Sequence, residues 1–307
     1  MSEWEHEPGR DTGTLPEPAP RHPAPEGGPG PAPESARRAA RPAPGGSAAP
    51  APEHPVPLES APVVLVTGAS SGIGAAVARR MTATGDRRLL LNGRDRERLA
   101  GVAAASGGTA LPGDLATAEG CRALARQALE AAGRVDVLVA NAGVGYEGPF
   151  ETMPPSALDE VIAVNLISPL RLVRALLPAM VRRGSGHVVL VASVAGAVAV
   201  GGESVYSAAK GGLCVFADSL RHEVRSSGVS VSVVLPGVVD TPFFERRGAP
   251  YRRRVPRPVP AERVAEAVCR AVERRQREVF VPRWLRIPAR LRGGAPALYH
   301  RMASRLA

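Results

Sequence analysis

The chain of 307 residues is long enough for one large α/β domain or two small ones, and an apolar content of 44% supports a substantial core. The longest uninterrupted apolar runs, at 62–66 and 188–192, have the length of strands and are too short to span a bilayer. Three widely spaced cysteines, Cys121, Cys214 and Cys269, exclude a CxxC or metal-ligand motif, so no metal site is expected. They favour a reducing, cytoplasmic compartment.

The net charge of +10 is unevenly distributed along the chain. Residues 1–60 carry −4 and residues 61–245 carry +1, whereas residues 246–307 contain 17 Arg and 4 Glu, which gives +13. The basic character is therefore a property of the C-terminal fifth. Residues 1–60 are rich in Pro, Ala, Gly and Glu without apolar periodicity, so we expect a disordered tail.

The ordered part is expected to begin with a buried strand at 62–66, the sequence TGASSGIG and a helix to about residue 84. A glycine-rich turn between strand and helix lets the backbone approach a diphosphate, and the helix N-terminus supplies free N–H groups. Here Gly68, Gly72 and Gly74 have the spacing GxxxGxG. This turn is a candidate dinucleotide-binding element, although glycine-rich turns also end strands for steric reasons alone.

A second strand is expected at 88–92, followed by Gly93, Arg94 and Asp95. In a dinucleotide-binding domain the end of this strand reads the adenosine ribose. Gly93 leaves room and the Arg94 guanidinium is suited to phosphate, which favours NADP(H) over NAD(H). Asp95 weakens that preference, but it is also a typical N-cap for a helix that begins at Arg96.

Strands and helices continue to alternate to residue 281. This alternation of strands and helices predicts an α/β fold with a doubly wound parallel sheet and helices on both faces. We expect a Rossmann-type sheet of about seven strands in the order 3-2-1-4-5-6-7. We expect the long helical segment 156–183 to bend near Pro169 and to end at Gly184. The other expected strands are 109–111, 135–140, 187–192, 229–235 and 278–281, and the other expected helices are 117–132, 206–227 and 261–275.

The stretch 193–210 carries the strongest chemical signal. Tyr206 and Lys210 are four residues apart, so on a helix they share one face, and Ser193 ends the fifth strand. An ammonium beside a phenol favours the phenolate, and lowering the phenol pKa by ~3 units requires about 4 kcal/mol. Lys210 is the single lysine of the chain, and arginine cannot replace its compact ammonium. The pattern YxxxK alone is also compatible with a solvated surface helix.

The sequence closely resembles the short-chain dehydrogenase/reductase family over about residues 62–282, which implies that 61–282 form an NAD(P)-binding catalytic domain. The resemblance implies an alcohol/ketone oxidoreductase with a nicotinamide cofactor, which is expected to supply the hydride. It also implies a homodimer or homotetramer. The matching motifs are TGASSGIG, the turn at Asp114, Asn-Ala-Gly at 141–143, Asn165, Ser193, YSAAK at 206–210 and Pro236-Gly237.

The resemblance also implies roles for individual residues. Tyr206 exchanges a proton with the substrate oxygen, Ser193 hydrogen-bonds that oxygen, Lys210 lowers the Tyr206 pKa and holds the nicotinamide ribose, and Asn165 anchors a water-linked proton relay. NADP-preferring relatives often carry a basic residue at position 71, where this chain has Ser71, so Arg94 must carry the preference alone. The implied cofactor-binding residues are Gly68, Ser70, Ser71, Gly72, Ile73, Gly74, Arg94, Asp114, Leu115, Asn141, Ala142, Gly143, Tyr206, Lys210, Pro236, Gly237, Val239 and Thr241.

The segment after Thr241 occupies the place where the family usually has a substrate lid. Its aromatic side chains are expected to close an apolar pocket beside Ser193, which favours a bulky apolar ketone, lipid-like or steroid-like, over a sugar. Packing of these aromatic side chains in the core alone remains an alternative. The expected substrate-binding residues are Ser193, Val144, Tyr146, Val194, Phe243 and Phe244.

Residues 283–307 form a basic, amphipathic extension that contains Trp284. Such segments bind anionic membrane surfaces, so we expect peripheral membrane contact through this extension. The protein is otherwise expected to be a cytoplasmic enzyme with a small-molecule carbonyl or alcohol substrate. Intersubunit packing is the next interpretation, and no specific nucleic-acid binding is expected although the charge attracts nucleic acid. A non-catalytic NADP(H)-sensing protein on the same fold is the alternative function.

Overall fold

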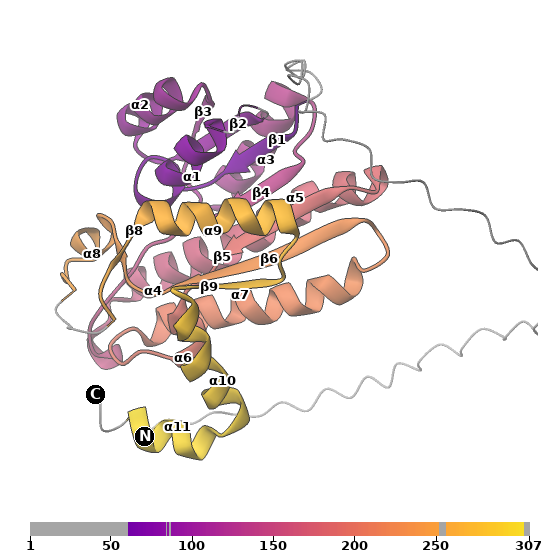
Figure 1. The fold of residues 1–307 in the computed structure, drawn as a ribbon. Coiled ribbons are helices and arrows are strands. Elements are labelled where there is room, and N and C mark those ends of the chain that lie inside the picture. Colours follow the sequence, from indigo (N-terminus) through magenta and orange to yellow (C-terminus); the bar gives the residue numbers. More distant parts are fainter. Residues whose placement is uncertain (1–60, 84, 86, 252–255, 304–307) are drawn as a thin grey trace, which may run out of the picture. The chain divides into compact units, whose positions relative to one another are not determined.

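The computed structural model describes residues 61–303, with gaps at 84, 86 and 252–255 (Figure 1). The tail expected at 1–60 and the last residues, 304–307, lie outside the described residues. The described part belongs to one compact unit, His54–Ala307.

Seven parallel strands form the central sheet in the order β3-β2-β1-β4-β5-β6-β9. This confirms the Rossmann-type order expected from the sequence, with β9 as the seventh strand. Side chains of the central strands are buried on both faces, as parallel sheets require, and Leu65 of β1 pairs with Leu90 and Leu138. The strands are β1 (Val63–Val66), β2 (Arg88–Gly93), β3 (Thr109–Pro112), β4 (Val137–Ala140), β5 (Gly186–Val191), β6 (Val229–Pro236) and β9 (Glu278–Val281), and a separate parallel pair is formed by β7 (Val239–Asp240) and β8 (Val259–Pro260).

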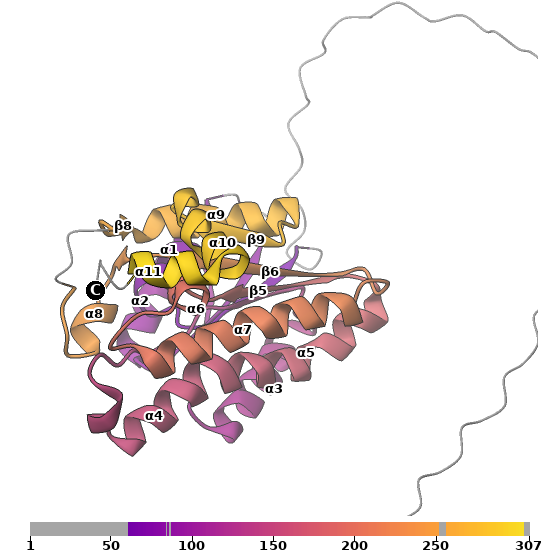
Figure 2. The same cartoon turned by 90° about the horizontal axis from the view of Figure 1, so that it is seen from below.

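Helices cover both faces of the sheet and enclose two apolar cores (Figure 2). One face is covered by α1 (Gly72–Thr82), α2 (Arg96–Ser106) and α9 (Ala261–Arg274), and the other by α3 (Ala118–Ala132), α4 (Pro155–Ile162), α5 (Ser168–Arg183) and α7 (Ser204–Glu223). The remaining helices are α6 (Val194–Val198), α8 (Phe243–Arg246), α10 (Arg286–Gly294) and α11 (Pro296–Ala303), with 3-10 turns at Phe150–Thr152 and Arg283–Leu285.

Local capping explains where two of these helices begin. Asp95 is the N-cap of α2, as expected, and its Oδ1 accepts a hydrogen bond of 2.9 Å from the Arg98 backbone N–H. Thr117 caps α3 in the same way, accepting from the Gly120 N–H at 3.0 Å. The helical segment that was expected to end at Gly184 does so, because this glycine adopts the left-handed conformation with φ +68°.

The long helical segment is interrupted at a different place from the one expected. Five residues, Ala163–Ile167, form a π-helical turn between α4 and α5, whereas Pro169 lies in the first turn of α5, where proline is tolerated. The π-helical turn contains Asn165, whose Nδ2 donates to the carbonyl oxygens of Val161 at 2.9 Å and Val144 at 2.8 Å. The asparagine side chain thus links the π-helical turn to the loop after β4.

The helical stretch Pro155–Arg183 is long and apolar enough to cross a membrane by length and composition alone. Core helices meet the same criterion. In this fold the stretch packs against α3 and β5, and it carries the fully buried Asn165. Part of its apolar surface is therefore buried in the core.

We expect Gly74→Ala to destabilise the fold by ~1–3 kcal/mol, the usual cost of overpacking. A methyl group there would lie 2.3 Å from the Gly68 carbonyl oxygen and 2.8 Å from Asn141 Nδ2. Gly101→Ala on α2 is the matched control, because nothing lies within 4 Å of the added methyl group. That control should gain ~1 kcal/mol from helix propensity. Denaturant unfolding measures both, and equal stability of the two variants would contradict the packing described.

Candidate active site

A cavity of about 1020 Å³ lies at the carboxyl ends of the strands. The residues that follow each strand from β1 to β6 contribute to its wall, and the sheet order reverses between β1 and β4. Ligands of doubly wound sheets bind at such a position. The predicted cofactor-binding residues that line the cavity are Gly68, Ser70, Ser71, Gly72, Ile73, Arg94, Asp114, Leu115, Asn141, Ala142, Gly143, Tyr206, Lys210, Pro236, Gly237, Val239 and Thr241.

The glycine-rich turn has the conformation that a dinucleotide site requires. Gly68 and Gly72 adopt positive φ angles of +66° and +54°, which favour glycine, and α1 begins directly after the turn. Ser71 is the N-cap of α1 but makes no side-chain capping bond, so the first N–H groups of the helix are left for another acceptor. These features fit a bound diphosphate.

Two of the predicted cofactor-binding residues, Gly74 and Asn141, have structural roles beside the glycine-rich turn. Gly74 does not line the cavity, because it packs directly against the Gly68 carbonyl group. Asn141 does line the cavity, but its Nδ2 donates to the Thr67 carbonyl oxygen at 2.9 Å and so ties β4 to the turn after β1. The sequence motif identified both positions, and the fold shows why they are glycine and asparagine.

At the end of β2, the expected phosphate ligand Arg94 lies in the cavity wall and pairs with Glu160 of α4 at 2.9 Å. The Asp95 carboxylate is engaged by Arg98, with an ion pair of 2.7 Å. The hydrogen bond from the Arg98 backbone, followed by the Arg98 charge, holds the pKa of Asp95 below its ordinary value. The Asp95 carboxylate is thus ionised and held by its own helix, and its ion pair with Arg98 offsets part of its charge.

Arg246, which the sequence analysis did not single out, is the third arginine near this end. It projects from α8, and its guanidinium donates to the Ser71 hydroxyl. The only sequence signal was the basic run that follows Phe244. Because Ser71 and Arg246 are far apart in sequence, no local pattern could have paired them.

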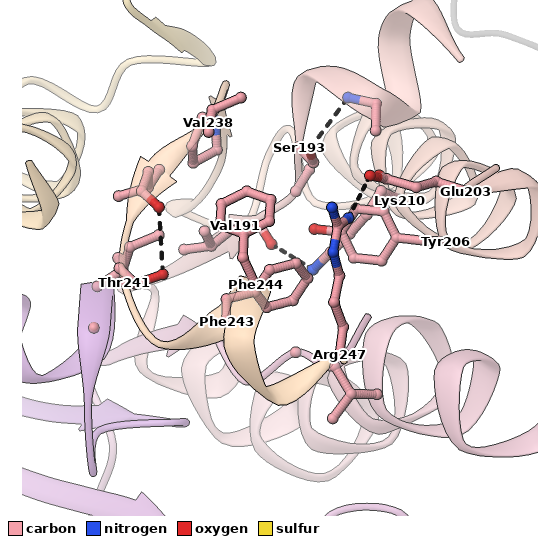
Figure 3. Close-up of a pocket in the computed structure, with 18 of the residues that line it drawn as sticks. Val191, Ser193, Glu203, Tyr206, Lys210, Val238, Thr241, Phe243, Phe244 and Arg247 are labelled. Carbon is pink, nitrogen blue, oxygen red and sulfur yellow. Dashed lines mark hydrogen bonds and ion pairs between the residues drawn. The ribbon is translucent and has the colours of Figure 1, made fainter. Parts of the chain in front are cut away.

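The predicted chemical groups converge on one part of the cavity (Figure 3). Ser193 follows β5 and is the N-cap of α6, where its Oγ accepts from the Ala195 N–H at 3.2 Å. Tyr206 and Lys210 lie one turn apart on α7. The buried Lys210 Nζ donates to the Val191 carbonyl oxygen at 3.0 Å and lies 5.8 Å from the centre of the Tyr206 ring.

The expected lowering of the Tyr206 pKa is wrong for this arrangement of protein groups. Burial raises the pKa of Tyr206 above its ordinary value, and the opposing effects of the Ser193 hydroxyl and the Arg247 guanidinium are smaller. Lys210 does not offset burial, because its ammonium is hydrogen-bonded to Val191 instead of the phenol oxygen. The phenol is therefore protonated at neutral pH, and burial also lowers the pKa of Lys210 to about 8.

Asn165 lies behind the main cavity, in a smaller adjoining space that it shares with Lys210. Its Oδ1 is the one fully buried side-chain polar atom without a hydrogen-bond partner among the residues described. A Cβ atom at Gly143 would lie 2.9 Å from this oxygen and 3.7 Å from Lys210 Nζ, so the glycine keeps the space between them open. An unpartnered buried acceptor beside an ammonium points to a missing polar partner.

The substrate side agrees with the sequence analysis except at one residue. Val144, Val194, Phe243 and Phe244 line the cavity together with Ser193. Tyr146 does not, because its ring lies over Gly148, with its hydroxyl 2.9 Å from where a Cβ of that glycine would be.

Arg247, which the sequence analysis also missed, fixes the lid helix α8. Its side chain is only 3% exposed, and it pairs with both Glu147 and Glu203. Its guanidinium lies 4.6 Å from the centre of the Phe244 ring. The Phe243 ring centre lies 5.7 Å from that of Tyr206, so α8 places an aromatic surface beside the phenol (Figure 3).

The C-terminal segment forms another wall of the cavity. Helices α10 and α11 lie beside α6 (Figure 1), where Arg292 donates to the Ala197 carbonyl oxygen at 2.9 Å and the Tyr299 hydroxyl donates to that of Val198 at 2.6 Å. Their amphipathic pattern gave no sign of this position. The segment contributes Trp284, Leu285, Pro288, Leu291 and Tyr299 to the cavity wall.

Comparison with known proteins agrees with this geometry. A family model described as short chain dehydrogenase matches residues 62–251. Ketoacyl reductase HetN of Nostoc sp. is 37% identical over 226 residues, which cover 71% of this chain and 77% of that protein. A short-chain dehydrogenase from Sphingobium yanoikuyae in complex with NADPH is 31% identical, with a TM-score of 0.69 and coverage of 79% of this chain and 95% of that chain. A short chain dehydrogenase/reductase from Burkholderia phymatum in complex with NAD is 25% identical, with a TM-score of 0.71 and coverage of 79% and 96%.

Because the chain contains a single lysine, isotope-labelled lysine gives one side-chain NMR signal, that of Lys210. We expect this signal to titrate near pH 8 in the folded protein and near pH ~10.4 in denaturant. Between about pH 8 and pH ~10.4 the Lys210 side chain is still protonated in the unfolded chain but deprotonated in the folded chain. Stability should therefore rise with pH in this window, and Lys210→Met should lack the rise. A folded titration midpoint near ~10.4 would contradict the burial of this ammonium.

Proposed function

The chain belongs to the short-chain dehydrogenase/reductase family and is an oxidoreductase, and on that premise we propose that it interconverts a ketone or aldehyde and an alcohol with NADP(H), using Tyr206 as the acid/base. One observation carries the proposal: Ser193, Tyr206 and Lys210 converge in the same cavity that the glycine-rich turn opens into. The bound nicotinamide would supply or accept the hydride.

The proton side of the reaction is assigned to Ser193 and Tyr206. In reduction, the Tyr206 hydroxyl donates its proton to the substrate oxygen, and the Ser193 hydroxyl hydrogen-bonds that oxygen as negative charge develops. The raised pKa keeps the phenol in its acid form at neutral pH. Oxidation requires the phenolate, so it should speed up as the pH rises.

Lys210 and Asn165 are assigned supporting roles. An ammonium has three N–H donors, and one of those of Lys210 goes to Val191. We assign the others to the nicotinamide ribose hydroxyls and to a proton relay that includes the unpartnered Asn165 Oδ1. The pKa of about 8 keeps Lys210 predominantly charged at neutral pH and makes its charge sensitive to mild alkali.

The preference for NADP(H) is supported by the charges at the end of β2. Arg94 lines the cavity, and the two acids beside it, Asp95 and Glu160, are paired with Arg98 and Arg94. NADPH is bound by one similar structure and NAD by another, so the assignment depends on this chain's own arginines.

A bulky apolar carbonyl compound is the substrate class that the cavity supports best. The lid residues Phe243 and Phe244 and the C-terminal residues Trp284 and Leu291 present apolar surface on the substrate side. Lipid-like and steroid-like ketones supply the complementary surface. A panel of apolar and hydroxylated ketones, followed by loss of NADPH absorbance, tests this assignment, and preferential turnover of sugars would contradict it.

The alternative of a non-catalytic NADP(H) sensor is disfavoured because all four candidate catalytic residues are present in the expected elements. A homo-oligomer, a cytoplasmic location and peripheral membrane contact through residues 283–307 remain part of the proposal. Exposed apolar side chains on this segment, Trp284, Ile287 and Leu298, support contact with another surface. Light scattering measures the oligomeric state, and pelleting with anionic vesicles measures membrane contact.

We expect Tyr206→Phe to lower kcat by roughly 10²–10⁴-fold, because the substrate oxygen loses its proton donor. The variant retains the ring that packs against Phe243. NADPH affinity should therefore change by less than about 2-fold, a free-energy difference of roughly 0.4 kcal/mol. Steady-state kinetics and equilibrium titration separate the two effects. Undiminished turnover would remove Tyr206 as the acid/base.

We expect Arg94→Ala to weaken NADPH binding by about 10- to 100-fold, the loss of one charge-assisted hydrogen bond, and to leave NADH binding within about 2-fold. Glu160→Gln is the matched control, because it releases Arg94 from its ion pair without removing the guanidinium. NADPH binding should be kept or strengthened in that variant. Titration calorimetry with both cofactors measures the effect, and equal losses for NADPH and NADH would contradict the assignment.

A further inference from the structure

Helix α8 connects the two ends of the cavity. Its last residue, Arg246, donates a hydrogen bond to Ser71, the N-cap of α1, beside the expected adenosine end. Its first residue, Phe243, packs against Tyr206 at the chemical end, with ring centres 5.7 Å apart. The two ends of this four-residue helix therefore contact the cofactor side and the catalytic side of the cavity.

The charges at the adenosine end leave one arginine without a counter-ion. Arg94 pairs with Glu160 and Arg98 pairs with Asp95. Arg246, in contrast, contacts a neutral hydroxyl, and no ion pair of its guanidinium is found within the described part of the chain. An uncompensated guanidinium in a cavity wall is a ready site for an anion.

Repulsion among the three guanidiniums leads to the same conclusion. The pKa of Arg246 is held below its ordinary value, first by burial and then by the positive charges of Arg98 and Arg94. Like charges that gather at one site raise the free energy of the folded chain unless an anion offsets them. Because Arg94 and Arg98 are already paired with Glu160 and Asp95, an anionic group bound beside them would offset the remaining charge, that of Arg246.

The position of Ser71 indicates which phosphate this is. The glycine-rich turn lies against the end of β2, where the Ala69 N–H donates to the Asn92 carbonyl oxygen at 2.7 Å. A Cβ atom on Gly93 would lie 3.0 Å from the Ser70 side chain. The charges of Arg94, Asp95 and Arg98 all act on the Arg246 guanidinium, and the four residues line the same cavity, so Arg246 lies near the ribose-reading end of β2.

We propose that Arg246 binds the 2′-phosphate of NADP(H) and, through α8, couples that phosphate to the position of Phe243 beside Tyr206. The inference rests on the NADP(H) preference proposed above and extends it from the end of β2 to the substrate lid. The lid arginine thereby replaces the basic residue that position 71 lacks. Because linkage is reciprocal, a ligand that fixes the lid also strengthens binding of the 2′-phosphate.

The first experiment measures equilibrium binding of NADPH, NADH, 2′-AMP and 5′-AMP by calorimetry. We expect Arg246→Gln to weaken NADPH and 2′-AMP by about 10-fold or more, and NADH and 5′-AMP by less than about 2-fold. Arg246→Lys, which keeps the charge, should retain most of the affinity. Arg263→Gln on the exposed face of α9 is the matched control for loss of one positive charge and should bind all four ligands as the parent protein does.

The second experiment measures coupling to the lid without any substrate. The chain has five phenylalanines, so labelling with 4-fluorophenylalanine gives five fluorine NMR signals, and Phe243→Leu identifies that of Phe243. We expect 2′-AMP, which has no nicotinamide, to shift this signal in the parent protein. The shift should be absent with saturating 2′-AMP in Arg246→Gln, and 5′-AMP should not produce it in either protein.

The outcomes distinguish the role of Arg246 from the proposed NADP(H) preference on which it rests. If Arg94→Ala discriminates NADPH from NADH but Arg246→Gln does not, the role of Arg246 is overturned while the NADP(H) preference stands. If the parent protein binds NADH as tightly as NADPH, the preference itself fails. Equal loss of NADPH and NADH in Arg246→Gln would place Arg246 on the diphosphate and overturn the assignment. An unmoved Phe243 signal in the parent protein would overturn the coupling.

Discussion

The geometry of the candidate active site depends on one buried hydrogen bond, from the Lys210 ammonium to the Val191 carbonyl oxygen. A buried charge without partners is costly, and this carbonyl at the end of β5 supplies a partner from the sheet itself. The bond ties α7 to the sheet and thereby fixes Tyr206 beside Ser193. Burial also brings the lysine pKa to about 8, so the ammonium that the site requires is close to losing its proton.

The phenol and the amine affect each other less directly than their spacing indicates. A spacing of four residues on a helix places the Tyr206 and Lys210 side chains on one face. The Lys210 ammonium, however, donates to the Val191 carbonyl oxygen, and burial raises the pKa of the Tyr206 phenol. A protonated phenol suits proton donation, which is the role that reduction requires. The electrostatic environment of the protein groups thus keeps the phenol in its protonated form at neutral pH.

The lid and the C-terminal helices complete the cavity with contacts that join distant segments. Arg247 is buried between Glu147 and Glu203, while the adjacent Arg246 reaches the glycine-rich turn. Helices α10 and α11 close another side of the same cavity. The cavity wall of this chain is therefore completed by segments that follow β6 in sequence.

The sequence by itself determined the elements whose signals are local. Buried apolar runs that alternate with helical segments predicted the strands and their order, which the sheet confirms. Asp95 predicted a helix start, Gly184 predicted a helix end, and the glycine-rich turn with Ser193, Tyr206 and Lys210 predicted a candidate site whose residues line one cavity. Only the tertiary structure decided the π-helical turn at Asn165, the displacement of Tyr146 from the cavity, the direction of the Tyr206 pKa and the contact of Arg246 with Ser71. Helix and strand periodicities, caps and turns act within a few residues, whereas burial and charge pairing depend on side chains that only the folded chain brings together.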